Sequence, residues 1–138
     1  MILCLKSRLI KSLLACQDGW SSFNNNCYRL FTAELLSWDE GSKLCNLNDA
    51  TLASIHSKEE NDFVATVTGP DTGGWIGGRR NGTWPDPNFY WTDKSEFDYI
   101  NWKSTRHRDD CIRMGWRSGG WVANNCFAKA YPVCKSLS

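Results

Sequence analysis

The chain has 138 residues, enough for one hydrophobic core and too few for two, because protein domains typically hold about 100 to 150 residues. Lys and Arg number 16 against 15 for Asp and Glu, and this balance argues against a nucleic-acid-binding protein or one held on an anionic membrane. Seven cysteines in so short a chain indicate a disulfide-bonded domain from an oxidising compartment rather than a cytosolic enzyme.

Residues 1–15 (MILCLKSRLIKSLLA) are predicted to be a leader or an incomplete signal segment. Lys6, Arg8 and Lys11 interrupt the apolar run, so removal during secretion and a misassigned start remain equal alternatives. The segment is also too short and too charged to span a bilayer, which needs about 20 mostly apolar residues, and we expect no stable membrane insertion. If the segment is removed, Cys4 goes with it and six cysteines remain.

A first helix is predicted over residues 36–46 (LSWDEGSKLCN). Ser37 followed three residues later by Glu40 is the signal of a capping box, in which each residue caps the backbone of the other. Trp38 and Cys45 then fall on one face at helical spacing. This face is expected to pack against the core.

A second helix is predicted over residues 57–67 (SKEENDFVATV), where Ser57 and Glu60 repeat the capping signal. Three apolar side chains follow in helical register: Phe63, Val64 and Val67. Residues 69–70 (GP) end the helix. Between the two helices, residues 51–55 (TLASI) alternate in polarity and predict either a short strand or a packed connector.

From residue 74 onward, short apolar or aromatic runs are broken by turn residues, a pattern typical of strands joined by large loops. The runs include WIGG, FYWTD, YINW, CIRMGW, GGWV and YPVC. The glycine pairs at 73–74 and 77–78 are interpreted as turns beside these strands. Two helices followed by a loop-rich sheet region predict an α+β domain.

In this order, the segments from Cys16 to Cys134 resemble the long form of the C-type lectin-like domain family. Residues 16–31 resemble its amino-terminal hairpin, and Trp75-Ile76-Gly77 resembles its WIG strand motif, with Gly78 where the family has leucine. Further matches are the two helices, Tyr90-Trp91-Thr92-Asp93 with Asn101-Trp102 as a strand pair, and the closing strands around Asp110-Cys111, Gly120-Trp121, Cys126 and Val133-Cys134.

The resemblance implies one C-type lectin-like domain over residues 16–136, with two helices, two small antiparallel sheets and a loop-rich binding face. Six cysteines allow 15 pairings, and the resemblance selects one set. The implied disulfides are Cys16–Cys27, Cys45–Cys134 and Cys111–Cys126. We expect structural roles for all six cysteines rather than metal ligation.

Sugar-binding members of the family hold calcium with side-chain oxygens from two motifs, and the resemblance implies that both are missing here. The Glu-Pro-Asn or Gln-Pro-Asp tripeptide is absent from residues 103–110, and Trp121 is followed by Val122 and Ala123 instead of Asn-Asp. Calcium needs about six to eight oxygen ligands, so we expect no calcium and no other cofactor. Two residual carboxylates are interpreted as ion-pair partners of Arg106, Arg108 and Arg113: Asp109 and Asp110.

Residues 103–120 hold five basic side chains against two acidic ones, whereas residues 16–60 hold three against seven. Arginine binds sulfate, phosphate and carboxylate in a bidentate manner, so we hypothesise calcium-independent recognition of an anionic glycan or an acidic protein surface. The candidate ligand-binding residues are Arg106, His107, Arg108, Arg113, Trp116 and Arg117. Arg79 and Arg80 would join them only if their hairpin lies nearby, and a solvated strand with outward arginines explains the segment equally well.

The predicted function is therefore that of a secreted, extracellular binding module for a protein or glycan ligand. An enzyme is not expected, because no thiol is left free near His56 or His107 and no nucleophile-elbow or zinc-protease motif occurs. His56 is expected to be structural or exposed. Asn81-Gly82-Thr83 predicts glycosylation of Asn81. Two alternative functions remain open. One is a lectin with an atypical or residual calcium site, and the other is a structural or self-associating module, which could form an oligomer.

Overall fold

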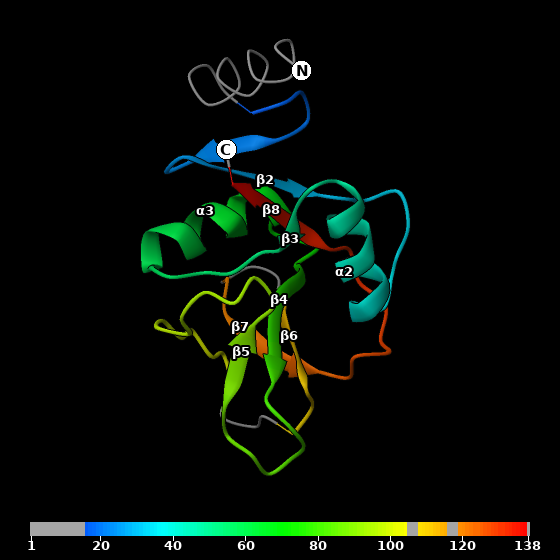
Figure 1. The fold of residues 1–138 in the computed structure, drawn as a ribbon, viewed down its shortest axis with the longest axis vertical. Helices are drawn as coiled ribbons and strands as arrows, with labels where there is room; N and C mark the ends of the chain where they lie inside the picture. Colours follow the sequence, from blue (N-terminus) through cyan, green and yellow to red (C-terminus); the bar gives the residue numbers. More distant parts are fainter. Residues whose placement is uncertain (1–15, 105–107, 116–118, 138) are drawn as a thin grey trace.

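The computed structural model describes residues 16–104, 108–115 and 119–137 and confirms an α+β architecture (Figure 1). Its elements in chain order are β1 (Ser21–Phe23), β2 (Asn26–Leu30), α2 (Trp38–Leu47), β3 (Thr51–Leu52), α3 (Lys58–Thr68), β4 (Gly74–Arg80), β5 (Phe89–Trp91), β6 (Cys111–Met114), β7 (Trp121–Asn124) and β8 (Val133–Leu137). The strands form two antiparallel sheets, ordered β1-β2-β8-β3 and β5-β4-β6-β7. In the described part of the chain, no helix is long and apolar enough to cross a membrane.

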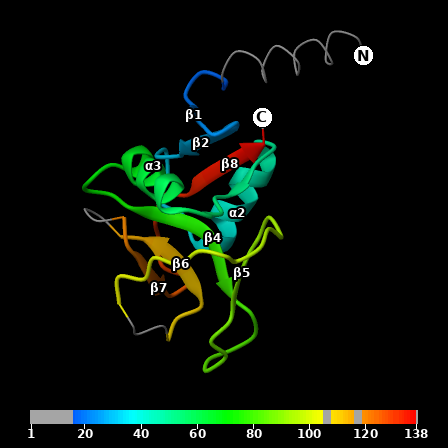
Figure 2. The same cartoon turned by 90° about the vertical axis from the view of Figure 1, so that its left-hand side faces the viewer.

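The first sheet joins the two ends of the described chain. β1 and β2 form a hairpin whose turn residues Asn24 and Asn25 have φ of 50° and 67°, a backbone conformation that asparagine tolerates well. β2 then pairs with β8 along its whole length (Figures 1 and 2). Residues 51–55 were predicted to be either a short strand or a packed connector, and they are both. Thr51–Leu52 forms strand β3, which pairs with β8, and residues 53–55 are buried in the connector that follows.

Helix α2 begins as predicted. The Ser37 hydroxyl accepts a hydrogen bond from the Glu40 N–H at 3.3 Å, and the Glu40 carboxylate accepts one from the Ser37 N–H at 2.9 Å. Both halves of the capping box are therefore present. Trp38 and Cys45 lie on one buried face, as their spacing predicted, and Gly41 belongs to the same face.

Helix α3 begins where predicted and buries polar side chains beside its apolar ones. Ser57 accepts from the Glu60 N–H at 3.0 Å, but the Glu60 carboxylate turns inward instead of returning to Ser57. Val64 is buried, and Phe63 and Val67 are half-buried and pack against the core, so the apolar register is as predicted. The sequence did not indicate that Glu60 and Asn61 are buried as well. The reason is polar pairing in the interior: the Trp121 indole N–H donates to Asn61 Oδ1 at 2.7 Å, for example.

The glycines at 74, 77 and 78 lie inside β4, so their interpretation as turns was wrong. A Cβ atom on Gly77 would lie 2.5 Å from the Leu52 carbonyl oxygen, and one on Gly78 would lie 2.3 Å from Ile112 Cδ1. Glycine at these positions allows β4 to approach the first sheet and lets Ile112 of β6 fill the space beside it. Close packing, rather than a turn, explains the residue type.

The strand pair expected at Tyr90–Asp93 and Asn101–Trp102 forms only in part. β5 ends at Trp91, where the Lys94 N–H donates back to the Trp91 carbonyl and Lys94 takes a φ of 67°. Trp102 makes an isolated parallel bridge with Trp121 instead of belonging to a strand. The turn after Trp91 thus replaces the second half of the expected strand.

Three disulfides close the fold with the implied pairing: Cys16–Cys27, Cys45–Cys134 and Cys111–Cys126. Large aromatic side chains fill the core between the sheets. Trp75, Trp91 and Trp121 are at most 1 % exposed, and the Trp91 and Trp121 rings meet edge to face at 5.4 Å.

Candidate functional site

The hairpin loop 81–88 and the segment 108–110 lie at one end of the long axis of the molecule, beyond β4, β5 and β6 (Figures 1 and 2). We call these two segments, with β6 and β7, the loop face. Of the predicted ligand-binding residues, Arg108 is exposed and Arg113 is half-buried in β6. Burial lowers the pKa of Arg113 below its ordinary value. The remaining predicted residues lie outside the described part of the chain: Arg106, His107, Trp116 and Arg117.

The two positions at which the family resemblance implies missing calcium ligands, Val122 and Ala123, lie in β7. Val122 pairs directly with Arg113 across the sheet and Ala123 pairs with Ile112, and both are half-buried. Residues that pair across antiparallel strands share a sheet face, so the hydrocarbon side chain of Val122 lies beside the Arg113 guanidinium stem. This environment provides no side-chain oxygen from either position.

The side chains of the last residue of β7, Asn124, and of the residue after it, Asn125, bind to the local backbone. Asn124 Oδ1 accepts from the Asn125 N–H, and Asn125 Oδ1 accepts from the Phe127 N–H, each at 2.8 Å. In the described ranges, no group of three or more His, Cys, Asp or Glu residues is placed to hold a metal ion. The oxygens of these asparagines therefore organise the turn that leads to Cys126.

Asp110 forms an ion pair as expected, but its described partner is Arg80. The Arg80 Nε donates to Asp110 Oδ1 at 2.9 Å, and Arg80 Nη2 donates to the Asp109 carbonyl oxygen at 3.0 Å. The proximity arises because the Arg80 N–H also donates to the Asp110 carbonyl at 2.7 Å, where β4 reaches the start of β6. The sequence predicted partners that are close to Asp110 along the chain, Arg106, Arg108 and Arg113, and did not predict Arg80.

Neither hairpin arginine is available as a free ligand contact. Arg80 is 2 % exposed, so it lies inside the loop face rather than on it. Arg79 lies over the Trp38 ring at 5.0 Å and donates to Asp39 Oδ1 at 3.2 Å, which ties it to α2. The hairpin does lie near the predicted site, but its arginines are committed to neighbouring side chains.

A polar network around His56 was not predicted from the sequence. His56 Nδ1 lies 2.7 Å from Asp98 Oδ1, and Nε2 lies 3.0 Å from Ser95 Oγ and 3.2 Å from Ser54 Oγ. Of the two alternatives expected for His56, structural or exposed, these contacts favour the structural one, because they fasten the chain after β5 to the connector after β3. The network depends on the segment 93–98 lying close to His56, and no signal in the sequence indicates that proximity.

Although this network contains Ser, His and Asp, its hydrogen bonds do not favour nucleophilic catalysis. Both Ser54 and Ser95 hydroxyls donate to Asp93, since an ionised carboxylate can only accept. Burial raises the pKa of Asp93, but the hydrogen bonds from Ser54 and Ser95 together lower it by more. The pKa of Asp93 is therefore below its ordinary value. Neither serine therefore directs its proton toward His56, as a nucleophile of the Ser-His type would.

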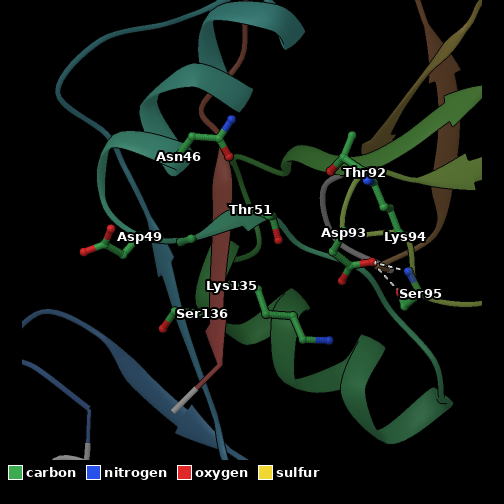
Figure 3. Close-up of a pocket in the computed structure, with 10 residues that line it drawn as sticks. Asn46, Asp49, Thr51, Thr92, Asp93, Lys94, Ser95, Lys135 and Ser136 are labelled. Atoms are coloured by element: carbon green, nitrogen blue, oxygen red, sulfur yellow. Dashed lines mark hydrogen bonds between the residues drawn. The ribbon is translucent and has the colours of Figure 1, made fainter. Parts of the chain in front are cut away.

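A pocket of about 600 Å³ lies between the end of α2, the β3–β8 pair and the turn after β5 (Figure 3). Its lining residues are Asn46, Asp49, Ala50, Thr51, Thr92, Asp93, Lys94, Ser95, Lys135 and Ser136. Its most buried charged groups already have partners: Lys135 donates to Glu60 and Ser54, and Asp93 accepts from Ser54 and Ser95. Neither of the two ligand-binding candidates that the structure describes, Arg108 and Arg113, lines it.

Comparison with known proteins places these features in a family. The model of the Lectin C-type domain matches residues 34–136. Snaclec EMS16 subunit beta of Echis multisquamatus is 34 % identical over 132 residues, which cover 91 % of this chain and 82 % of that protein. Ladderlectin of Oncorhynchus mykiss is 36 % identical over 121 residues, which cover 80 % of this chain but only 62 % of ladderlectin.

Among solved structures, a calcium-independent type II antifreeze protein superimposes with a TM-score of 0.80. The two share 26 % sequence identity, and the match covers 89 % of this chain and 95 % of the other. This likeness confirms the expected arrangement of two helices and two antiparallel sheets.

Proposed function

The chain belongs to the C-type lectin domain family, and from that premise we propose that it is a secreted binding module that recognises a protein or an anionic glycan without calcium. One observation carries the proposal. The position where sugar-binding relatives supply calcium oxygens is occupied by Val122, and its cross-strand neighbour is Arg113. A calcium ion there would lack two ligands and would face a fixed positive charge.

The same charge favours an anionic ligand. Arg108 is exposed and Arg113 is half-buried, so at least one guanidinium can form bidentate contacts with sulfate, phosphate or carboxylate. Arg106 and His107 belong to the proposed site because they adjoin Arg108 in the sequence. Trp116 and Arg117 are weaker members, because their described neighbour Gly119 lies beside Asn61 of α3, at the other end of β6 from residues 108–110. We favour this binding role over an enzymatic one, because the Ser-His-Asp network described above does not activate a nucleophile.

The test is binding to an array that carries sulfated and unsulfated glycans, with acidic peptides as further probes, in EDTA and again in calcium chloride. We expect binding to sulfated glycans or acidic peptides that is unchanged by EDTA. The double variant Arg106→Ala/Arg108→Ala should bind about tenfold more weakly, which corresponds to about 1.4 kcal/mol. The control Lys43→Ala/Lys58→Ala removes the same charge from exposed positions on the helices and should bind as the unmodified protein does.

Two outcomes of this experiment would reject parts of the proposal. Unchanged glycan binding by the double arginine variant would exclude the proposed anionic-glycan site. Sugar binding that disappears in EDTA, together with a stoichiometric heat of calcium binding, would favour the alternative of a lectin with an atypical calcium site. Size-exclusion chromatography tests the third possibility, a structural or self-associating module, which would elute as an oligomer.

Secretion and glycosylation belong to the same proposal. Asn81 is exposed in the loop 81–88, and Gly82 takes a φ of 99°, so the sequon lies in an accessible turn. Expression through a eukaryotic secretory pathway should yield a product whose mass falls on treatment with a glycan-removing amidase, and Asn81→Gln should abolish that shift. Amino-terminal sequencing of the secreted product should begin at Cys16 if residues 1–15 are a cleaved leader.

A further inference from the structure

We propose that the guanidinium of Arg80 is a built-in structural cation that fixes the two loops of the loop face. The side chain of Arg80 is fully buried, at 0 % exposure, although it lies between two segments at the end of the molecule. A charged group in this position needs several partners to offset its lost hydration. Arg80 has them.

Within the described residues, oxygen atoms from both loops converge on this guanidinium. Nη1 donates to the carbonyl of Asp86 in loop 81–88, Nη2 donates to the carbonyl of Asp109 at 3.0 Å, and Nε donates to Asp110 Oδ1 at 2.9 Å. One planar cation therefore connects two segments that are more than twenty residues apart in the sequence. Carboxylate and carbonyl oxygens are also the ligands that calcium takes from proteins.

Aromatic rings close the remaining sides. Arg80 Cζ lies 4.6 Å from the centre of the Phe89 ring and 5.2 Å from that of Trp84. Trp84 is itself 52 % exposed, so it lies between the guanidinium and solvent and covers the charge. Contacts between a desolvated cation and aromatic faces add to the stability of such a site.

The guanidinium is well matched to this task. Its rigid fork of five N–H donors contacts oxygens in several directions at once, which the compact ammonium of a lysine cannot reproduce. Because Arg80 already occupies the oxygens of Asp86, Asp109 and Asp110, the loops can keep their conformation without metal. This inference deepens the proposed function by explaining how a calcium-free loop face keeps its shape, but the anchoring can be tested without any ligand.

The experiment measures amide hydrogen exchange in the loops. The Asn81 N–H donates to the Asn88 carbonyl at 2.7 Å and the Asp86 N–H donates to the Thr83 carbonyl at 2.9 Å, so these two amides report on loop 81–88. In the unmodified protein, their protection should be the same in EDTA and in calcium chloride. In Arg80→Met, we expect about tenfold faster exchange at both amides, while the Gly77 amide, which donates to Ala53 at 2.8 Å, keeps its protection.

Two further variants make the result specific. Arg79→Met removes a neighbouring arginine that contacts α2 and should leave loop exchange unchanged. Arg80→Lys keeps the charge but not the fork, and should lie between the unmodified protein and Arg80→Met. If Arg80→Met does not fold, Asp110→Asn decides, because it leaves Arg80 in place and should still accelerate exchange at Asn81 and Asp86.

The inference is overturned if EDTA alone accelerates exchange of the loop amides, or if Arg80→Met leaves it within about twofold of the unmodified protein. The same holds if Asp110→Asn is the variant measured and exchange does not change. A failure of the glycan and peptide array, with the exchange results as expected, would reject the proposed ligand and leave the anchoring role of Arg80 intact.

Discussion

Lys135 of β8 places its ammonium nitrogen 2.7 Å from Glu60 Oε2 of α3, and each side chain is less than a tenth exposed. The same carboxylate oxygen accepts from the Tyr28 hydroxyl at 2.5 Å, and Lys135 also donates to the Ser54 carbonyl at 3.1 Å. Burial, followed by the contact with Glu60, raises the pKa of Tyr28 above its ordinary value. The pair thus joins the second helix, the central strands of the first sheet and the connector.

Replacing Lys135 by Met should lower the free energy of unfolding by about 3–5 kcal/mol, because Glu60 would remain as an unpaired buried charge. Urea-induced unfolding measures the change. Lys58→Met is the matched control, since Lys58 pairs with Asp62 at 2.8 Å on the exposed surface of α3 and its removal should cause no measurable loss. Equal stability of the two variants would contradict this account of the buried pair.

Two of the three disulfides close loops of very different length, and their removal should lower the stability by different amounts. Cys45–Cys134 joins residues 89 positions apart, whereas Cys16–Cys27 joins residues 11 apart. In the chain-entropy model, their removal costs about 4–5 and about 3 kcal/mol respectively, because the longer loop restricts the unfolded chain more. Urea unfolding of the paired Cys→Ala variants checks the order, and a larger loss for the amino-terminal pair would show that entropy does not determine it.

Glu40 should make part of the stability depend on pH in the acid range. Hydrogen bonds from the Ser37 backbone and then from Lys129 lower the pKa of Glu40 from its ordinary 4.5 to about 2. Because the folded-state pKa is the lower one, the stabilisation is complete above pH 4.5 and is lost as the pH falls toward 2.

The stability difference between the unmodified protein and Glu40→Gln should therefore disappear across this range. Thermal unfolding at a series of pH values measures it, and a carbon NMR titration of the Glu40 carboxyl gives the pKa directly. Glu34→Gln serves as the control and should retain the pH dependence assigned to Glu40. A midpoint near the ordinary value would show that the capping box is not formed in solution.

The adjacent glycines of β4 should respond differently to added bulk. Gly77→Ala places a methyl group against the Leu52 carbonyl, which β3 holds in its pairing with β8, so we expect a loss of about 1–3 kcal/mol. Gly78→Ala meets the end of the Ile112 side chain instead. Adding Ile112→Val, which removes the nearest atom, should recover part of the loss at Gly78 and none of the loss at Gly77.

Local signals were sufficient to predict both helix starts, because a capping box involves only residues three positions apart. They could not separate Glu40, which completes its box at the surface, from Glu60, whose partners Tyr28 and Lys135 are 32 and 75 residues away. The glycines of β4 were misinterpreted for a similar reason. A glycine required for close packing looks the same in a sequence as one required for a turn.

For the candidate site, too, the sequence predicted some features and missed others. The cysteine pairing and the register of Val122 and Ala123 followed from the family resemblance, and Asp110 was correctly expected to form an ion pair. Its partner Arg80 comes from another strand, and only the folded sheet brings the two together. The His56 network likewise depends on a loop that lies about forty residues further along the chain.

The pairing of β2 with β8 has a consequence for how the molecule can be attached to other structures. Because both strands belong to the same sheet, the carboxyl end and the amino-terminal hairpin lie at one pole, while loop 81–88 lies at the opposite pole (Figures 1 and 2). A linker, a second domain or a solid support joined to Leu137 would therefore leave the opposite pole facing outward. The architecture suits display of its loops from an anchored base.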